Sequence, residues 1–249
     1  MKVSIITICY NSASTIEATI QSVIAQEYHD IEYIIIDGAS KDDTISIVNK
    51  YREQIARIIS EPDQGIYDAM NKGVKAASGD VIGILNSDDI YADTHVIDDI
   101  VKTFRSNKCD AVYADLVYVD REDTSKVIRY WKSGKYEEGK FLNGWMPPHP
   151  TFFVKREVYE SHGIYNTSFR SAADYEFMLR VIHKFKISLA YLPRVITKMR
   201  VGGESNVTLK NRIRANKEDR RAWEINQLQP RFYTLFFKPL SKLIQFVRK

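Results

Sequence analysis

The chain has 249 residues, of which 44% are hydrophobic and 27% are charged, and its formal net charge is +4. This length allows one domain with a substantial core, and so modest a charge argues against nucleic-acid binding. No run of 18 uncharged apolar residues and no basic, cleavable leader is found, so we expect neither a membrane span nor a signal peptide. The only two cysteines, Cys9 and Cys109, favour a reduced, cytoplasmic protein over a disulfide or a thiolate zinc site.

The first hundred residues alternate between short β-branched runs and amphipathic stretches. The runs are typical of strands buried on both faces and cover residues 3–8, 31–36, 55–59 and 81–85. Helical patterns lie between them, at residues 16–24, about 42–51 and 66–77. This order predicts an α/β fold, with a Rossmann-like, mainly parallel sheet flanked by helices.

The rest of the chain is less regular. Strands are predicted at 111–119, 127–130, 151–154 and 187–192, and helices at 174–184 and 208–226. Residues 131–150 contain three glycines and three prolines, which indicates a long loop of the kind that often forms a binding lid. The last segment, 231–249, is aromatic and basic, and Pro239 would interrupt or kink a helix there.

Polar residues follow each of the first four predicted strands. In an open α/β sheet ligands bind beyond these carboxyl ends, so Asp37, Asp88 and Asp89 are expected to share one crevice. Neighbouring carboxylates repel each other unless a cation lies among them, and Mg²⁺ or Mn²⁺ suits one or two carboxylates plus phosphate oxygens. Taken singly, each of these aspartates also suits a turn or a helix cap.

An ordered series of short motifs resembles the family 2 glycosyltransferases. The motifs are Val3-Ser-Ile-Ile-Thr-Ile-Cys-Tyr-Asn11, Ile36-Asp-Gly-Ala-Ser-Lys-Asp-Asp-Thr44, Gly65-Ile-Tyr-Asp-Ala-Met-Asn-Lys-Gly73 and Leu85-Asn-Ser-Asp-Asp89. The match is strong over about the first 100 residues and weaker to about residue 205. The resemblance implies a GT-A fold, a UDP- or GDP-sugar donor, a Mn²⁺ or Mg²⁺ cofactor and inversion at the anomeric carbon.

The resemblance also implies roles for single residues. Those expected to bind the donor are Thr7, Tyr10, Asn11, Asp37, Asp68, Lys72, Asn86, Ser87 and Asp88. Asp88 would be the metal-binding end of the family's D-x-D motif, with Asp89 as a further metal ligand. Asn86 replaces the first aspartate of that motif and brings no charge, although it can still form hydrogen bonds.

Asp174 matches the general base of the family, and a carboxylate facing the acceptor can take the proton of the attacking hydroxyl. Glu176 is the alternative base, and Asp174 also suits a helix cap. His149 is expected to contact donor phosphate or acceptor, although a single histidine is more often structural. Arg200 precedes two glycines and would reach the diphosphate on a flexible loop.

We expect a glycosyltransferase domain at 1–205, with a nucleotide-binding half at 1–100 and an acceptor half at 101–205, followed by a basic helical tail at 206–249. The acceptor would be a glycan or a lipid-linked hydroxyl in cell-surface polysaccharide or glycolipid synthesis, and Trp131 or Trp145 could stack on a sugar. The last part of this tail, residues 231–249, would contact the inner face of the membrane or pack on protein, including a second subunit. The alternatives are a sugar nucleotidyltransferase and a non-catalytic nucleotide-sugar-binding protein.

Overall fold

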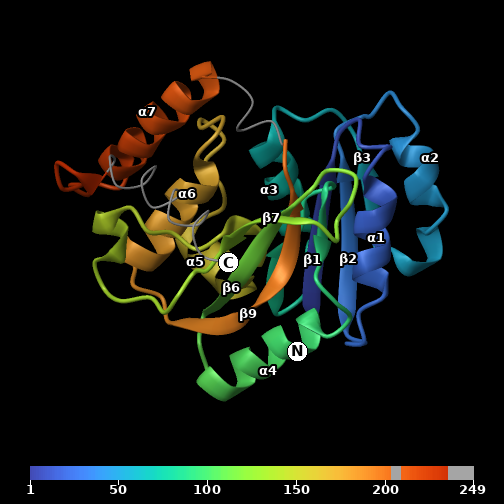
Figure 1. Cartoon of the computed structure of the whole chain (residues 1–249), viewed down its shortest axis with the longest axis horizontal. Coiled ribbons are helices and arrows are strands. Elements are labelled where there is room, and N and C mark those ends of the chain that lie inside the picture. Colours follow the sequence, from blue (N-terminus) through green and yellow to red (C-terminus); the bar gives the residue numbers. More distant parts are fainter. Residues whose placement is uncertain (203–208, 235–249) are drawn as a thin grey trace.

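One curved, mixed sheet forms the centre of the molecule, with helices on both faces (Figure 1). The computed structural model describes residues 1–202 and 209–234. Within these residues the sheet has nine strands in the order β3-β2-β1-β4-β8-β6-β9-β5, with β7 paired to β6. The strands are β1 (Val3–Cys9), β2 (Ile31–Asp37), β3 (Arg57–Ser60), β4 (Val81–Ile84), β5 (Asp89–Tyr91), β6 (Ala111–Val119), β7 (Val127–Trp131), β8 (Phe153–Lys155) and β9 (Leu189–Arg200).

The helices that cover the sheet are mostly short. They are α1 (Ile16–Ile24), α2 (Thr44–Asn49), α3 (Ile66–Ala76), α4 (Val96–Asn107), α5 (Arg156–His162), α6 (Ala173–Met178) and α7 (Leu209–Ile225). Single turns of 3₁₀ helix lie at η1 (Arg52–Gln54), η2 (Lys140–Asn143) and η3 (His149–Thr151), and α6 continues as a π-helical segment, η4 (Leu179–Lys184).

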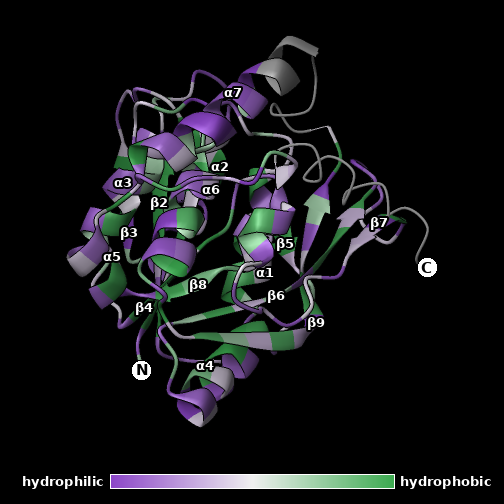
Figure 2. Ribbon diagram, turned by 90° about the vertical axis from the view of Figure 1, so that its left-hand side faces the viewer, coloured by the Kyte–Doolittle hydropathy of each residue, from purple (hydrophilic) through white to green (hydrophobic). Residues whose placement is uncertain are grey.

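The first half of the sheet is parallel, and its inner strands are buried on both faces. Strands β3, β2, β1 and β4 run in the same direction, and all seven residues of β1 are buried. Ile6 and Ile8 face the core beneath α3, whereas Ile5 and Cys9 face the core beneath α1 and α4. Burial on both faces explains why continuous hydrophobic runs, rather than alternating ones, mark this half. Figure 2 shows the same hydrophobic colouring on β6 and β8, further along the sheet.

The second half of the sheet is mixed, so the parallel arrangement does not extend across the whole molecule. Strand β8 is antiparallel to β4 and β6, β7 is antiparallel to β6, and β5 is antiparallel to β9, while β6 and β9 are parallel. The predicted α/β class is confirmed, and the positions of β1, β2, β4 and β6 agree with the sequence patterns.

The structure differs from the sequence prediction in three additional elements and in the boundaries of two strands. The helices α4 and α5 and the strand β5 were not predicted, and β3 begins at Arg57 rather than at residue 55. Strand β9 extends to Arg200, well beyond the predicted end at residue 192, because the chain passes Pro193 at a bulge where the register with β6 shifts.

The helix α7 packs against the main domain through buried contacts with α6. The Trp223 indole is fully buried and donates a hydrogen bond to the Tyr175 hydroxyl, with an N–O distance of 2.9 Å. Asn226 donates to a carboxylate oxygen of Glu176 at 2.9 Å. The predicted boundary at residue 205 stays a prediction, and most of the segment 231–249 lies outside the described residues. No helix in the described ranges is long and apolar enough to cross a bilayer.

Candidate active site

Asp37 ends β2 and organises the loop that follows. Its carboxylate is completely buried and accepts hydrogen bonds from the backbone N–H and the hydroxyl of Ser40 and, at 2.6 Å, from the hydroxyl of Ser60. Donors within the protein therefore fix this carboxylate at the carboxyl end of β2. Its predicted contact with a base or ribose stays a prediction.

Tyr10 is the exposed member of the group predicted to hold the nucleotide. Its side chain is 59% exposed beside Gly38, where an added Cβ would lie 3.3 Å from Tyr10 Cδ2 and 2.8 Å from Asp63 Oδ2. Tyr10, Gly38 and Asp63 thus form one surface at the end of β1 and β2. An exposed aromatic ring in this place can stack on a planar base.

Asn11 and Thr7 have structural contacts instead. Asn11 adopts a left-handed conformation with φ of 49°, and its side-chain oxygen accepts the Lys41 N–H at 2.9 Å. Thr7 is completely buried and accepts a hydrogen bond from the Tyr33 hydroxyl at 3.1 Å. Both residues stabilise, from inside the protein, the edge formed by the carboxyl ends of the parallel strands, which we call the rim. Their own contact with a nucleotide stays a prediction.

Lys72 of α3 lies among three carboxylates. Its ammonium nitrogen is 2.7 Å from Asp63 Oδ1, 3.0 Å from Glu61 Oε1 and 3.6 Å from Asp68 Oδ2. Partial burial lowers the pKa of Lys72, but the hydrogen bonds to Asp63 and Glu61 together outweigh this effect, so the pKa is raised. Lys72 therefore anchors the loop after β3 to α3, next to the Tyr10 surface.

The turn between β4 and β5 carries the residues expected to bind metal. The Ser87 hydroxyl is 2.8 Å from the Ser12 hydroxyl, and the Thr19 hydroxyl donates to the carbonyl oxygens of Ser87 and Asp89. These contacts join the turn to α1 and to the end of β1. Burial raises the pKa of Asp88, while the positive charges of Arg200 and Arg121 oppose that rise.

Two buried oxygens in this turn lack a hydrogen-bond donor among the described residues: Asn86 Oδ1 and Asp89 Oδ1. Burial and the neighbouring charge of Asp88 raise the pKa of the completely buried Asp89 well above its ordinary value. Unpaired oxygens beside a carboxylate suit a hard cation. Within the described ranges no cluster of three or more His, Cys, Asp or Glu forms a complete metal site, so the residues fit an ion that takes its other ligands from a diphosphate.

Arg200 does not lie on a flexible loop, and this expectation was wrong. It is the last residue of β9 and only 8% exposed, because its guanidinium is held between two backbone carbonyls. It donates to the carbonyl oxygen of Asp88 at 2.7 Å and to that of Arg121 at 3.1 Å. Arg200 therefore lies next to the β4–β5 turn that is predicted to bind metal, but it contacts the backbone of that turn.

Asp174, the predicted base, is the second residue of α6 and remains partly accessible. The Tyr67 hydroxyl donates to its Oδ1 at 3.0 Å, and Tyr67 stacks on Tyr165 with ring centroids 6.2 Å apart. His149 lies 3.2 Å from the Tyr165 hydroxyl through Nε2. Burial lowers the pKa of His149, although the negative charge of Asp174 opposes that change, so the imidazole is neutral at physiological pH.

Glu176, the alternative base, is buried and fully engaged. Its Oε1 accepts hydrogen bonds from Arg180 and Asn226, both at 2.9 Å, and its Oε2 accepts a second one from Arg180 at 3.1 Å. The side chain is 2% exposed. A carboxylate committed in this way to an ion pair has no oxygen free for an acceptor proton, which leaves Asp174 as the accessible acid on α6.

The two tryptophans expected to contact a sugar have partners within the protein. The Trp145 indole donates to the Ser133 carbonyl at 2.8 Å and packs edge-on against Tyr113 and Phe141. Trp131 is a partly buried residue of β7, paired with Leu116 of β6. Trp145 therefore packs as part of the 131–150 loop.

The helix α3 joins the two ends of the site. Tyr67 at its start contacts the predicted base, and Lys72 one turn later contacts the loop beside Tyr10. On the other side, the bond from the Asn11 N–H to the Ser40 hydroxyl and that between Ser12 and Ser87 connect the Asp37 loop to the Asp88 turn. These bonds join Asp37 and Asp88, whereas Asp174 is connected to them only through α3, and a crevice shared by the three aspartates stays a prediction. Sequence reasoning missed Tyr67, Asp63 and Arg121, of which the first two lie within or beside quoted motifs.

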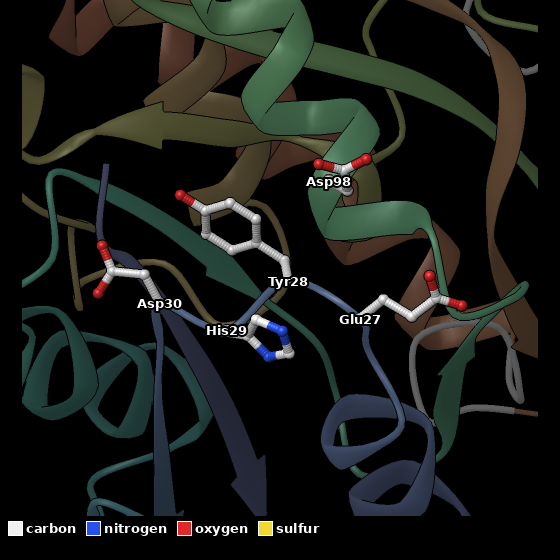
Figure 3. Close-up of a pocket in the computed structure, with 5 residues that line it drawn as sticks. All are labelled: Glu27, Tyr28, His29, Asp30 and Asp98. Carbon is white, nitrogen blue, oxygen red and sulfur yellow. The ribbon is translucent and has the colours of Figure 1, made fainter.

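A separate hollow lies at the amino end of β2, lined by Glu27, Tyr28, His29, Asp30 and Asp98 (Figure 3). It opens at the edge opposite the carboxyl ends of the parallel strands. Asp30 lies 3.6 Å from the amino terminus, and Glu27 lies 3.2 Å from His95. An acidic hollow repels a diphosphate, so this place does not compete with the rim as a donor site.

Comparisons with known proteins point to one family. Residues 4–165 match the family model described as glycosyl transferase family 2. An uncharacterised glycosyltransferase of Mycobacterium tuberculosis is 34% identical over 180 residues, which cover 72% of this chain and 68% of the relative. A PGL/p-HBAD biosynthesis glycosyltransferase of Mycobacterium bovis is 28% identical over 207 residues, 82% of this chain and 78% of the relative.

Solved structures of the same fold are also found. Staphylococcus aureus TarS 1-349, in complex with UDP-GlcNAc, superposes with a TM-score of 0.70 at 17% identity, over 91% of this chain and 65% of that one. The mannosyltransferase PcManGT of Pyrobaculum calidifontis, in complex with GDP-Man and Mn²⁺, gives a TM-score of 0.68 at 21% identity, over 97% of this chain and 68% of that one. These likenesses bear out the GT-A type of the fold.

Proposed function

This chain belongs to glycosyl transferase family 2 and is a glycosyltransferase, and we propose that it moves a sugar from a nucleotide-diphosphate sugar to a hydroxyl group with inversion at the anomeric carbon. The observation that carries the proposal is the position of α3. Through Tyr67 and Lys72 this helix connects an accessible carboxylate, Asp174, to the rim that holds Tyr10, Asp37 and Asp88. This connection would fix the proposed donor pocket and the proposed proton acceptor relative to each other.

The donor half of the reaction would use the Tyr10 surface and the β4–β5 turn. Tyr10 would stack on the base, which suits both uracil and guanine. Neighbours of the same fold have been solved with UDP-GlcNAc and with GDP-Man, which supports a UDP- or GDP-sugar donor. Family membership favours sugar transfer over the alternative of a sugar nucleotidyltransferase.

Asp88 would hold a divalent cation, with the unpaired oxygens of Asn86 and Asp89 close by. A bound Mn²⁺ or Mg²⁺ supplies positive charge that stabilises the departing diphosphate. The Mn²⁺ in PcManGT supports this assignment. Asp89 is completely buried, so its own part as a ligand would be through the unpaired Oδ1.

The acceptor half would use Asp174. As the acceptor oxygen forms its bond to the anomeric carbon, the bond from that carbon to the diphosphate oxygen breaks, and the hydroxyl proton passes to Asp174. Because Tyr67 occupies Oδ1, Oδ2 is the oxygen left to take the proton. His149 lies beside this carboxylate as a neutral imidazole and would help to hold the acceptor or a donor phosphate.

We further propose a glycan or lipid-linked acceptor and action at the inner face of the membrane, in the cytoplasm. Both cysteines are free and buried, as suits a reduced protein. Phe232 is one of the described residues of the segment 231–249. It is 89% exposed and lies beside the exposed Arg231. An exposed aromatic next to a cation suits an anionic membrane surface. A homodimer stays a prediction.

A donor screen tests the proposed function. Thermal unfolding should be measured with a panel of UDP- and GDP-sugars, each with Mn²⁺ and with a chelator. We expect one nucleotide class to raise the midpoint only when the metal is present, because a ligand of the native state stabilises it by an amount that grows with the logarithm of its concentration over Kd. Slow release of the nucleoside diphosphate from that donor should follow. A protein that binds the donor but never releases its sugar, with any acceptor, would be the non-catalytic alternative.

A further inference from the structure

The turn between β6 and β7 is a compact structure that lies next to the Asp88 turn. Asp120 accepts the backbone N–H groups of Glu122 and Asp123 at 3.0 and 3.2 Å, and its own N–H donates to the carbonyl of Lys126. The Val201 N–H donates to the Val119 carbonyl at 3.0 Å, which fixes the turn against the end of β9. A residue on this turn therefore has a defined place relative to the site.

Arg200 connects the β6–β7 turn to the metal-binding turn. Its Nη1 bonds the Asp88 carbonyl and its Nε bonds the Arg121 carbonyl, at 2.7 and 3.1 Å. Two of its nitrogens are thus committed to backbone, and burial keeps the side chain from following a ligand. Arg200 cannot present a free guanidinium face to a diphosphate without giving up these bonds.

In contrast to the buried Arg200, Arg121 has an exposed side chain. Its Nη1 points toward Gly202, where an added Cβ would lie 3.5 Å away. Within residues 1–202 and 209–234, no carboxylate forms a salt bridge with it. Its backbone carbonyl and that of Asp88 share the same Arg200 guanidinium, so the two turns lie next to each other. A guanidinium with such freedom can bind two phosphate oxygens at once.

We propose that Arg121 binds the diphosphate of the donor, and that Arg200 is a positioning residue that holds Arg121 and Asp88 in register. The inference rests on the proposed function, because it needs a nucleoside diphosphate at the Asp88 turn. It assigns the phosphate-binding role that was expected of Arg200 to an arginine on the β6–β7 turn. Asp88 with its cation and Arg121 would then hold the diphosphate from two sides.

The test compares three variants in calorimetric titrations with UDP, GDP, UMP and GMP in Mn²⁺. Arg121→Ala removes the guanidinium, Arg121→Lys keeps a point charge, and Lys126→Ala removes an exposed charge from the same turn as the matched control. We expect Arg121→Ala to weaken the diphosphate about tenfold while the affinity for the monophosphate changes much less, because a guanidinium bridging two phosphate groups loses most with the diphosphate. Arg121→Lys should recover part of the loss, and Lys126→Ala should behave as the wild type.

The outcomes separate this inference from the proposed function. Wild-type protein that binds neither UDP nor GDP overturns the proposed function and this inference together. Wild-type protein that binds one of them, with unchanged affinity in Arg121→Ala, overturns only the role of Arg121. An equal loss in Lys126→Ala and Arg121→Ala would show a general charge effect and would also reject it. For Arg200, the conservative Arg200→Lys should reduce the preference for diphosphate over monophosphate, and an unchanged preference would reject the positioning role.

Discussion

The hydroxyl group of Tyr67 donates a hydrogen bond to Oδ1 of Asp174, with an O–O distance of 3.0 Å, across 107 positions of sequence. Burial, together with the charge of Asp174, raises the pKa of Tyr67 far above its ordinary value, so the phenol remains a donor throughout the working pH range. The bond fixes one carboxylate oxygen and leaves the other for the acceptor. Tyr67 is therefore a positioning residue for the proposed base.

Tyr67→Phe removes this bond and little volume. We expect kcat to fall roughly tenfold, since a hydrogen bond to a charged group contributes about 1.5 kcal/mol. Donor affinity should stay unchanged, because Tyr67 contacts the proposed base and not the donor. Steady-state rates and donor titrations measure both effects, with Tyr159→Phe as the control, because the Tyr159 hydroxyl contacts Tyr165 and not Asp174. An equal loss of rate in Tyr159→Phe would indicate a purely structural role for Tyr67.

Asp174 and Glu176 lie on the same short helix and differ in what surrounds them. Asp174→Asn should keep donor affinity and lose transfer by about a hundredfold or more, because the proton acceptor is gone. Glu176→Gln should keep the transfer rate while its unfolding free energy falls by about 3 kcal/mol, because it leaves Arg180 without its buried partner. Transfer assays and urea unfolding distinguish the two variants. Normal transfer by Asp174→Asn would remove that residue as the base.

Asp88→Ala should abolish the effect of Mn²⁺ on donor binding, because the variant lacks the carboxylate that holds the cation. The measurement is donor affinity at increasing Mn²⁺, compared with Glu122→Ala, which removes an exposed carboxylate from the neighbouring β6–β7 turn. Full metal-dependent affinity in Asp88→Ala would place the ion elsewhere. The first position of the motif is Asn86, so Asn86→Asp, which restores the family residue, should tighten Mn²⁺ binding.

His149 predicts a pH dependence of stability. Burial lowers its pKa below the ordinary value near 6.5, so the unfolded chain binds the proton more readily than the folded one. As pH falls below about 6.5, stability is therefore lost, by at most ~1.4 kcal/mol per pH unit for this group. His149→Gln cannot titrate and should flatten the loss in urea unfolding between pH 7 and 5. Part of the slope should remain, because burial also lowers the pKa of His183.

Local patterns in the sequence predicted elements whose burial is continuous or periodic. Strand β1 is buried at every position, and the polar residues at its carboxyl end mark the rim, so both were predictable. The full length of β9 was not predicted, since Pro193 indicates the end of a strand unless a bulge accommodates it. The helix α4 was not predicted, although its sequence has a clear apolar stripe that includes Ile97, Ile100 and Phe104.

The contacts that specify the site lie far apart in sequence and have no local signature. The bond from Tyr67 to Asp174 and the bonds of Arg200 to Asp88 and Arg121 depend on how the halves of the sheet meet. Sequence types alone favoured Arg200 as a free phosphate ligand, because two glycines follow it. Only burial and the carbonyl partners distinguish a structural arginine from an accessible one.

Gly73 determines how closely α3 approaches β1, and with it the position of Tyr67. A Cβ at this position would lie 2.3 Å from Ile6 Cγ2, far closer than packed atoms allow. Gly73→Ala gains up to about 1 kcal/mol of helix propensity, but the clash should outweigh that gain and lower the unfolding free energy by about 1–3 kcal/mol. Because the helix must move away from the strand, transfer should fall as well. Urea unfolding and transfer rates, compared with Lys75→Ala on the exposed side of α3, measure the two effects. A stabilised, fully active Gly73→Ala protein would mean that the spacing between α3 and β1 does not control the site.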